Sequence, residues 1–462
     1  MRDGTARNPA ATLSPRRLDN VAPPRRGPLR WAVLGALLAV PSAAQDGPSR
    51  DELDFQGRSN IVVGSGARAL GMAGAFLARA DDATAASWNP AGLSYLRFPE
   101  LSLVGKGDWF DVTTRAPGPD RQDDGTDLRR GHTVDFVALT HPLDLGAVAG
   151  AVQFSFQRVI SFNDGRDIVR NRTPIRIDQQ GGFDVLAFGT GLRVSRKWRV
   201  GLTLNRWSNG FFQTFERGRP QRALLRTDFE FSGWNANLGL LYSPVENLNL
   251  GLVAKTPFTA NVRQVLERAN VADPDGPPQN RFDSAIATYP RIEIDFPGAV
   301  GFGASWRPSS PWTLSADYTR TFWSEGRIRN YFTLPFSGSP LENAPNHYYP
   351  ELPYPILNQP DQTDAEQIRV GVELVAHAGG DLAFPIRAGY FNDRQYFIAE
   401  DGTPPRFEGF TAGLGVIIGP LLLDAAYVYE RGSYLDVDMS GSRIRVKAQQ
   451  LVFSVIYRHA GR

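Results

Sequence analysis

Apolar residues alternate with polar or small residues along most of the chain after Leu96. A repeat of two residues is that of a β-strand with one apolar face. In the segment 311–328 the apolar face and the polar face are, respectively, Trp312, Leu314, Ala316, Tyr318 and Phe322, and Thr313, Ser315, Asp317, Thr319 and Thr321. Elsewhere the second face carries glycines, such as Gly301, Gly303, Gly413 and Gly415. The pattern predicts a long series of strands.

Fourteen strands follow from the breaks in this alternation. Their expected ranges are 98–113, 132–143, 146–161, 182–195, 197–215, 222–243, 247–266, 288–307, 311–328, 364–377, 382–397, 407–419, 420–435 and 445–458. Single-chain bacterial barrels have an even number of strands. A long run of alternating strands without helices favours a closed barrel over a sandwich. The predicted fold class is therefore all-β, a transmembrane antiparallel β-barrel of about 14 strands.

The links between these strands alternate in length. Short turns near 143–146, 196–197, 243–247, 308–311, 377–382 and 419–420 alternate with links at 114–131, 162–181, 267–287, 329–363, 398–406 and 436–444, with 216–221 a short exception. Short periplasmic turns opposite long extracellular loops are typical of outer-membrane barrels. Aromatic residues near strand ends are candidates for the two interfacial girdles, although some will point inward: Trp109, Phe110, Trp198, Trp207, Tyr242, Trp306, Trp312, Trp323, Tyr390 and Tyr429.

The first 44 residues have the order of an export signal. A basic region, a short apolar core and small residues at a cleavage site follow one another, namely Arg25, Arg26 and Arg30, then 31–40, then 41–44. The apolar core is too short to span a bilayer. We expect residues 1–44 to be a signal peptide that is cleaved during export.

Composition agrees with an exported barrel. The 462 residues include no Cys, and mean hydropathy is −0.28. After the signal no run of about 20 apolar residues could form a transmembrane helix, whereas a barrel hides its apolar surface in alternate residues. Removal of the seven Arg and two Asp of 1–44 changes the net charge from +2 to about −3. The basic whole-chain pI therefore indicates no nucleic-acid partner.

Candidate catalytic and metal-binding residues are sparse. All five histidines fall in or near predicted links, and none has a motif partner for nucleophilic or acid–base chemistry: His132, His141, His347, His377 and His459. Cys is absent, and no pair of histidines has the spacing of metal ligands. We expect no enzymatic activity, no cofactor and no metal site.

A segment rich in Gly and Ala lies between the signal and the first strand, at 65–93. Small residues allow close backbone packing, and the lumen of a barrel of about fourteen strands needs filling. Asp81-Asp82 and Asn89-Pro90 are turn formers. We expect residues 45–97 to form a plug inside the barrel of 98–462, with close packing at Gly66, Gly71 and Gly74.

The end of this segment, Trp88-Asn89-Pro90-Ala91-Gly92, resembles the Asn-Pro-Ala motif in the N-terminal hatch of the FadL/TodX family of outer-membrane channels for fatty acids and hydrocarbons. Further stretches look like strands of this family in the same order, at 250–258, 296–306, 312–318, 368–374 and 386–390. The resemblance implies a hatch formed by 45–97, with Asn89, Pro90 and Ala91 either pinning it or moving when substrate binds.

The resemblance also implies a function and its partners. It indicates passive uptake of long-chain fatty acids or other hydrophobic small molecules across the outer membrane of a Gram-negative bacterium, by a monomer surrounded by outer-membrane lipid and lipopolysaccharide. Capture by the loops, binding in the lumen and exit sideways beside a kinked third strand form the implied route. Gly146 and Gly150 are the candidate kink positions, although Gly150 could instead make room for the hatch.

Two further sets of residues are candidates for substrate contact. Arg369 and Arg387 lie opposite the apolar rows and could bind a carboxylate, or they could pair with lumen acids such as Glu373 or with the hatch. The link 329–363 is rich in aromatic residues that could form a landing surface or pack within the loop: Tyr331, Phe332, Phe336, Tyr348, Tyr349 and Tyr354.

An alternative function remains open from the sequence. The Gly/Ala-rich segment also resembles the plug of a related barrel group that includes a partner-binding protein of the Bacteroidetes type IX secretion machinery. In that case the barrel would be a protein-docking or secretion-associated module.

Overall fold

The computed structural model describes residues 64–115, 125–144, 146, 148–162, 164–170, 173–217, 222–271, 284–332, 347–348, 352–353, 363–435 and 441–459. The predicted signal peptide, the first part of the predicted hatch at 45–63, and Phe336, Tyr349 and Tyr354 lie outside these ranges. No helix among the described residues is long and apolar enough to span a membrane.

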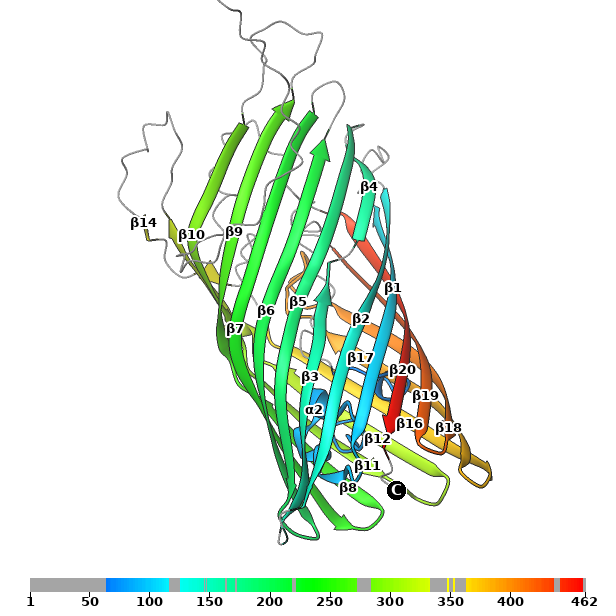
Figure 1. The fold of residues 1–462 in the computed structure, drawn as a ribbon. Coiled ribbons are helices and arrows are strands. Elements are labelled where there is room, and N and C mark those ends of the chain that lie inside the picture. Colours follow the sequence, from blue (N-terminus) through cyan, green and yellow to red (C-terminus); the bar gives the residue numbers. More distant parts are fainter. Residues whose placement is uncertain are drawn as a thin grey trace, which may run out of the picture. The chain divides into compact units, whose positions relative to one another are not determined.

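The described strands form one antiparallel sheet that closes on itself (Figure 1). β1 (Glu100–Arg115) pairs with β20 (Arg443–Arg458) from Glu100 opposite Arg458 to Arg115 opposite Arg443. The remaining strands are β2 (Gly125–Asp144), β3 (Ala149–Ser161), β4 (Asp164–Arg170), β5 (Thr173–Arg193), β6 (Trp198–Arg217), β7 (Arg222–Val245), β8 (Leu248–Lys255), β9 (Phe258–Val271), β10 (Ser284–Phe296), β11 (Ala299–Trp306), β12 (Trp312–Thr321), β13 (Arg327–Phe332), β14 (His347–Tyr348), β15 (Leu352–Pro353), β16 (Ala365–Gly379), β17 (Leu382–Arg394), β18 (Arg406–Ile418) and β19 (Leu421–Leu435).

These elements fill fourteen positions around the barrel, so the predicted fold is confirmed. Four positions are occupied by two consecutive strands each, namely β3 with β4, β8 with β9, β11 with β10, and β12 with β13. Three of these breaks are on adjacent positions, at 256–257, 297–298 and 322–326. Two of the three contain a proline, which has no N–H for the ladder.

Several predicted links are shorter than expected. β2 already begins at Gly125, β4 and the first part of β5 form a hairpin within 164–179, and β9 and β10 extend into the predicted link 267–287. The alternation signal fails here because outward positions such as Arg176 and Asp178 are themselves polar, while backbone pairing continues. These strand ends were therefore missed by a prediction based on one apolar face.

Large apolar side chains are exposed on the outward face of the barrel. On paired strands, Leu101 lies opposite Tyr457 and Leu103 opposite Val455, and all four are between 40% and 49% exposed. Trp109, Trp198, Trp306 and Trp312 are also exposed, as expected for girdle residues. Trp207 and Trp323 are buried inside instead. An outward apolar surface with interior polar groups is the arrangement of a transmembrane barrel.

Residues 64–96, here called the inner segment, contain three short helices. They are α1 (Ala67–Leu70), α2 (Ala85–Trp88) and the 3-10 helix η2 (Pro90–Tyr95). A further 3-10 helix, η4 (Trp323–Glu325), lies outside this segment, between β12 and β13. Asn89 is the N-cap of η2, where its side chain accepts a hydrogen bond from the backbone N–H of Ala91 (3.1 Å). Pro90 occupies the first position of the helix, where its missing N–H costs nothing.

Candidate functional site

The inner segment packs on a row of glycines on the inward face of the barrel. Gly191 of β5 lies opposite Gly201 of β6, which lies opposite Gly239 of β7. A Cβ at any of the three would come closer than 3.0 Å to Asn89, Pro90 or Ala91. Glycine is thus required for the backbone of the inner segment to approach these strands.

Asn89 connects this contact to the rest of the inner segment. Its side chain is completely buried. Its Nδ2 donates to the carbonyl oxygens of Leu77 (2.8 Å) and Leu240 (3.3 Å), while its Oδ1 accepts from Ala91. The Asn-Pro-Ala motif therefore joins two parts of the inner segment to β7.

Three glycines of the inner segment make further close contacts. Gly71 lies against Gly413 of β18, so that a Cβ on either would come within 3.1 Å of the other's Cα. Gly66 and Gly74 have φ values of +111° and +75°, which residues other than glycine rarely adopt. A Cβ on Gly74 would also lie 2.9 Å from the Arg369 guanidinium.

A buried ionic network joins the inner segment to the barrel wall. Glu373 of β16 accepts hydrogen bonds from Arg68 (3.5 Å) and Arg79 of the inner segment and from Arg387 of β17 (2.7 Å). Arg68 also pairs with Asp81 (2.7 Å). Burial by itself would raise the pKa of the Asp81 carboxyl, but the positive charges of Arg68 and Arg79 hold that pKa below its usual value. Several charges thus neutralise one another inside the lumen.

The two arginines predicted to bind a carboxylate are part of this wall. Arg387 pairs with Asp424 as well as Glu373, and Arg369 pairs with Asp393 (3.3 Å) while it donates to the carbonyl oxygen of Ala73 (2.8 Å). Both arginines are buried. These contacts agree with the pairing alternative that the sequence left open.

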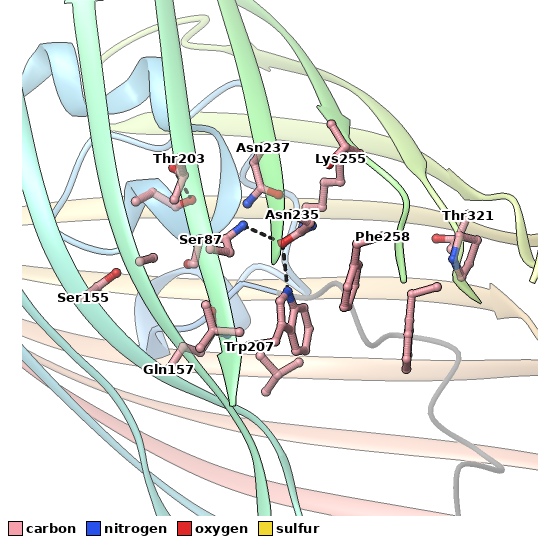
Figure 2. A pocket seen from close by; sticks show the side chains of 18 of the residues that line it. Ser87, Ser155, Gln157, Thr203, Trp207, Asn235, Asn237, Lys255, Phe258 and Thr321 are labelled. Carbon is pink, nitrogen blue, oxygen red and sulfur yellow. Dashed lines mark hydrogen bonds between the residues drawn. The ribbon is translucent and has the colours of Figure 1, made fainter. Parts of the chain in front are cut away.

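A cavity lies above the inner segment, with Ala86 and Ser87 on its lower side. About 720 Å³ is free of protein atoms there, open solvent included. Figure 2 shows the side chains of Asn235, Asn237 and Lys255 close to the rings of Trp207 and Phe258. The main polar residues are Asn205, Asn235, Asn237 and Lys255, and the main aromatic residues are Trp207, Phe258, Phe296 and Trp323.

Hydrogen bonds and ring stacking order this cavity. Asn235 Oδ1 accepts from Trp207 Nε1 (2.8 Å) and from the side chain of Asn205 (3.0 Å). The rings of Trp207, Phe258 and Phe296 are nearly parallel, with centroid separations of 5.2 Å for Trp207–Phe258, 5.0 Å for Phe258–Phe296 and 6.5 Å for Trp207–Phe296. The cavity therefore offers an aromatic wall beside a set of polar groups.

The aromatic wall continues into a larger buried cluster. Phe183 stacks on Phe231 (4.2 Å between centroids), and Trp323 stacks on Tyr396 (4.7 Å). Other members of the cluster are Ile160, Phe162, Val185, Phe211, Phe229, Val262 and Phe397. Apolar side chains from many strands thus meet inside the barrel, where apolar molecules are favoured over water.

The hydrogen-bonded ladder between β2 and the third barrel position is incomplete. The β2–β3 ladder ends at Phe136 opposite Gln157, although β2 remains paired with β1 as far as Gly125. The register of β3 against β5 shifts between Arg158 and Ile160, and β4 pairs only with β5 in the part of the chain described. This break lies beside a second cavity, and Gln157 and Val159 line both cavities.

The glycines predicted to kink the third strand lie away from this break. Gly146 is in the turn before β3, with a φ of +76°. Gly150 is in regular register, opposite Leu143 on one side and Leu192 on the other. The irregular part of β3 is therefore at 158–160.

The predicted landing residues are only partly described. Tyr331 and Phe332 belong to β13, where they lie opposite Tyr348 and His347 of β14. This pairing brings three of the predicted residues, Tyr331, Phe332 and Tyr348, onto two neighbouring strands.

Sequence reasoning missed the residues that line the first cavity. The best available signal was asparagine at three inward positions of neighbouring strands, Asn205, Asn235 and Asn237, since asparagine is depleted in strands. Lys255 and Trp207 have no comparable signal because each becomes part of the cavity only through the neighbouring strands.

Comparison with solved structures shows which fold this is. A FadL homologue from Pseudomonas aeruginosa is 15% identical with a TM-score of 0.58, and the match covers 86% of this chain and 98% of that one. The toluene transporter TodX of P. putida is 13% identical with a TM-score of 0.57, covering 87% of this chain and 100% of that one. The fold is that of the FadL/TodX channels. The toluene transporter TbuX of Ralstonia pickettii matches at 15% identity and a TM-score of 0.54, covering 86% of this chain and 99% of that one.

No protein-family model and no curated protein matches the sequence. The FadL-type fold is thus recognised from structure at low sequence identity. In this FadL-type barrel the inner segment, the two cavities and the incomplete ladder are the features that bear on function.

Proposed function

We propose that the protein is an outer-membrane channel for the passive uptake of hydrophobic small molecules. The main supporting observation is the cavity lined by stacked aromatic rings, which lies between the buried aromatic cluster and the inner segment. Solved channels of the same fold are described as toluene transporters and a monoaromatic hydrocarbon channel. An export signal at 1–44 would carry the chain out of the cytoplasm, which is the first step toward this membrane.

In this proposal the inner segment acts as the hatch. A barrel of about fourteen strands is wide enough to leak, and the glycine contacts and the ionic network hold the segment against several strands. A molecule captured at the extracellular end, in part by the aromatic residues of 329–363, would move along the aromatic cluster to the cavity. The hatch then blocks its direct path downward.

Because the hatch would block the direct path, the molecule would leave sideways through the wall, where the β2–β3 ladder ends. Gln157 and Val159 line both cavities, and the second cavity also contacts Asp135 of β2 and Ile160 of β3, next to the break in the ladder. A hydrophobic molecule gains free energy when it leaves a partly hydrated lumen for lipid. Movement of the hatch at Asn89–Ala91 would control access between the cavities.

The polar side of the first cavity favours a cargo with one charged end. Lys255 and the neighbouring asparagines could bind the carboxylate of a long-chain fatty acid while its chain lies along Trp207, Phe258 and Phe296. Arg369 and Arg387, the candidates for carboxylate binding from the sequence, pair with Asp393, Glu373 and Asp424. A neutral hydrocarbon would use the aromatic wall alone.

Uptake into liposomes tests both parts of the proposal. We expect wild-type protein to accelerate entry of labelled oleate and labelled toluene over empty liposomes, and Trp207→Ala to slow both. Lys255→Met should lower oleate uptake by about 10-fold or more, since a hydrogen bond to a charged group contributes about 1.5–3 kcal/mol, and leave toluene uptake unchanged.

The matched controls are Trp312→Ala on the outward face and Lys197→Met in a turn. Uptake equal to that of empty liposomes for both cargoes would refute the channel. Retrieval of a stoichiometric protein partner without any lipid would favour the docking alternative. Equal loss of oleate and toluene uptake in Lys255→Met would refute only the carboxylate assignment.

A further inference from the structure

A row of cations continues the outward face of β20 above its apolar part. Arg443, Arg445 and Lys447 occupy alternate positions of one strand, and all three are exposed. The outward residues below them on the same strand are apolar and exposed or half-buried, namely Leu451, Phe453, Val455 and Tyr457. The charges therefore begin where the lipid-facing surface ends.

Neighbouring strands add to this positive charge. Arg115 of β1 lies directly opposite Arg443, and like charges in this arrangement destabilise a strand pair. On the other side Arg431 of β19 lies opposite Lys447, but it is paired with Glu408 (2.6 Å). Among the residues described, none forms an ion pair with Arg115 or with the three cations of β20.

Two acidic groups lie nearby and do not neutralise the row. Asp111 of β1 is opposite Lys447, and its Oδ1 accepts a hydrogen bond from Thr113 (3.3 Å). Asp401, which accepts hydrogen bonds from Thr403, also interacts electrostatically with Arg443. Four cations against two carboxylates leave an excess of positive charge on this part of the surface. We call Arg115, Arg443, Arg445 and Lys447 the basic patch.

The height of the basic patch indicates which anion it meets. Strands in such barrels rise about 3.4 Å per residue and tilt about 40°, so four residues correspond to about 10 Å along the membrane normal. Lys447 is thus about 10 Å above Leu451, and Arg443 about 10 Å higher still. Lysine and arginine side chains extend toward headgroups from such positions.

We propose that the basic patch binds the phosphate groups of a lipopolysaccharide-type lipid in the outer leaflet. Arginine presents a fork of donors to phosphate oxygens, and lysine adds a point charge. The cations are spread over about 10 Å in height. This spread suits a lipid with phosphates at more than one level better than a glycerophospholipid with one phosphate. A bound phosphate would also offset the repulsion between Arg115 and Arg443.

Binding of purified full-length protein to rough lipopolysaccharide, measured by native mass spectrometry in detergent, tests this site. Each Lys or Arg near an anionic surface strengthens binding about fivefold, so the triple variant Arg443→Gln, Arg445→Gln, Lys447→Gln should bind about 100-fold more weakly. Enzymatically dephosphorylated lipopolysaccharide should bind wild-type protein as weakly as intact lipid binds the variant.

The matched control removes three exposed cations at the opposite end of the barrel, by Arg193→Gln, Arg196→Gln and Lys197→Gln, and should bind like wild type. The charge-retaining pair Arg443→Lys, Arg445→Lys should bind more tightly than the triple variant and more weakly than wild type, because lysine keeps the charge but lacks the guanidinium fork. Heat-modifiable migration on gels verifies that each variant is folded. Unchanged affinity in the triple variant, equal loss in the control, or equally tight binding of phosphatidylglycerol vesicles to the wild type would overturn the proposal.

Discussion

Substitution of Gly201 by alanine tests whether the inner segment is held by close backbone contact. A Cβ at this position would overlap the Pro90 carbonyl carbon and the Ala91 nitrogen, well inside the 3.0 Å that real Cβ atoms keep. Both of these are backbone atoms, so no side-chain rotation can relieve the overlap. The inner segment or β6 must shift.

The size of the effect follows from this overlap. Inserting a methyl group into a well-packed site costs about 1–3 kcal/mol. If the cost falls on the docked state of the inner segment, the population of the displaced state rises about 5- to 150-fold. Displacement opens the lumen, so single-channel recordings in planar bilayers should show larger or more frequent conductance steps.

Gly105→Ala is the matched control, because a Cβ at Gly105 has no atom within 4 Å. It should conduct like wild type, while Gly239→Ala, which meets Asn89 Oδ1, should behave like Gly201→Ala. If Gly201→Ala and Gly105→Ala conduct alike and unfold at the same temperature, close contact with Gly201 does not hold the inner segment.

Two further predictions concern the ionic network. Glu373→Gln removes the carboxylate shared by three guanidinium groups and should lower the free energy of unfolding by about 3–5 kcal/mol, measured by thermal or denaturant unfolding. The control Glu366→Gln, at a half-buried ion pair, should lower it by at most about 1 kcal/mol. Similar losses in the two variants would contradict a special role for Glu373. Because the pKa of Asp81 is lowered in the folded protein, its stabilising charge is fully present above the ordinary aspartate pKa of about 4 and is lost as the pH falls through the lowered value. The contribution of Asp81 to conductance should therefore change only below about pH 4. Asp81→Asn should raise conductance over the wild type at pH 7, and the two proteins should conduct more alike as the pH falls through the lowered pKa.

Much of the barrel could be predicted because the period of a strand is local. Trp312 to Phe322 already separate into an outward and an inward set in the sequence, and the structure places Thr313 and Asp317 inside, with Leu314 outside. The strand extension around Arg176 and Asp178 was missed, because neither outward residue there is apolar. Backbone pairing without an apolar face leaves no periodic signal.

The candidate site could be predicted less well. Asn89 and Pro90 were identified, and the Gly-rich inward faces of β11 and β18 were visible as small residues alternating with apolar ones. The sequence did not show why these glycines are needed, which is to leave space for the backbone of the inner segment. The acidic partners of Arg369 and Arg387 could not be chosen from the sequence. Glu373 lies directly opposite Arg387 on the paired strand, but Asp424 comes from another strand, β19.

The sequence by itself thus determined which residues face lipid and which face the lumen, because side-chain direction alternates with every residue of a strand. It also determined how many strand positions form the barrel. Only the tertiary structure decided which lumen residues meet. Lys255, Trp207 and Phe296 belong to β8, β6 and β10, and they line one cavity because their side chains point into the lumen from nearby strands. The break beside β2 likewise depends on pairing between strands, which no single strand encodes.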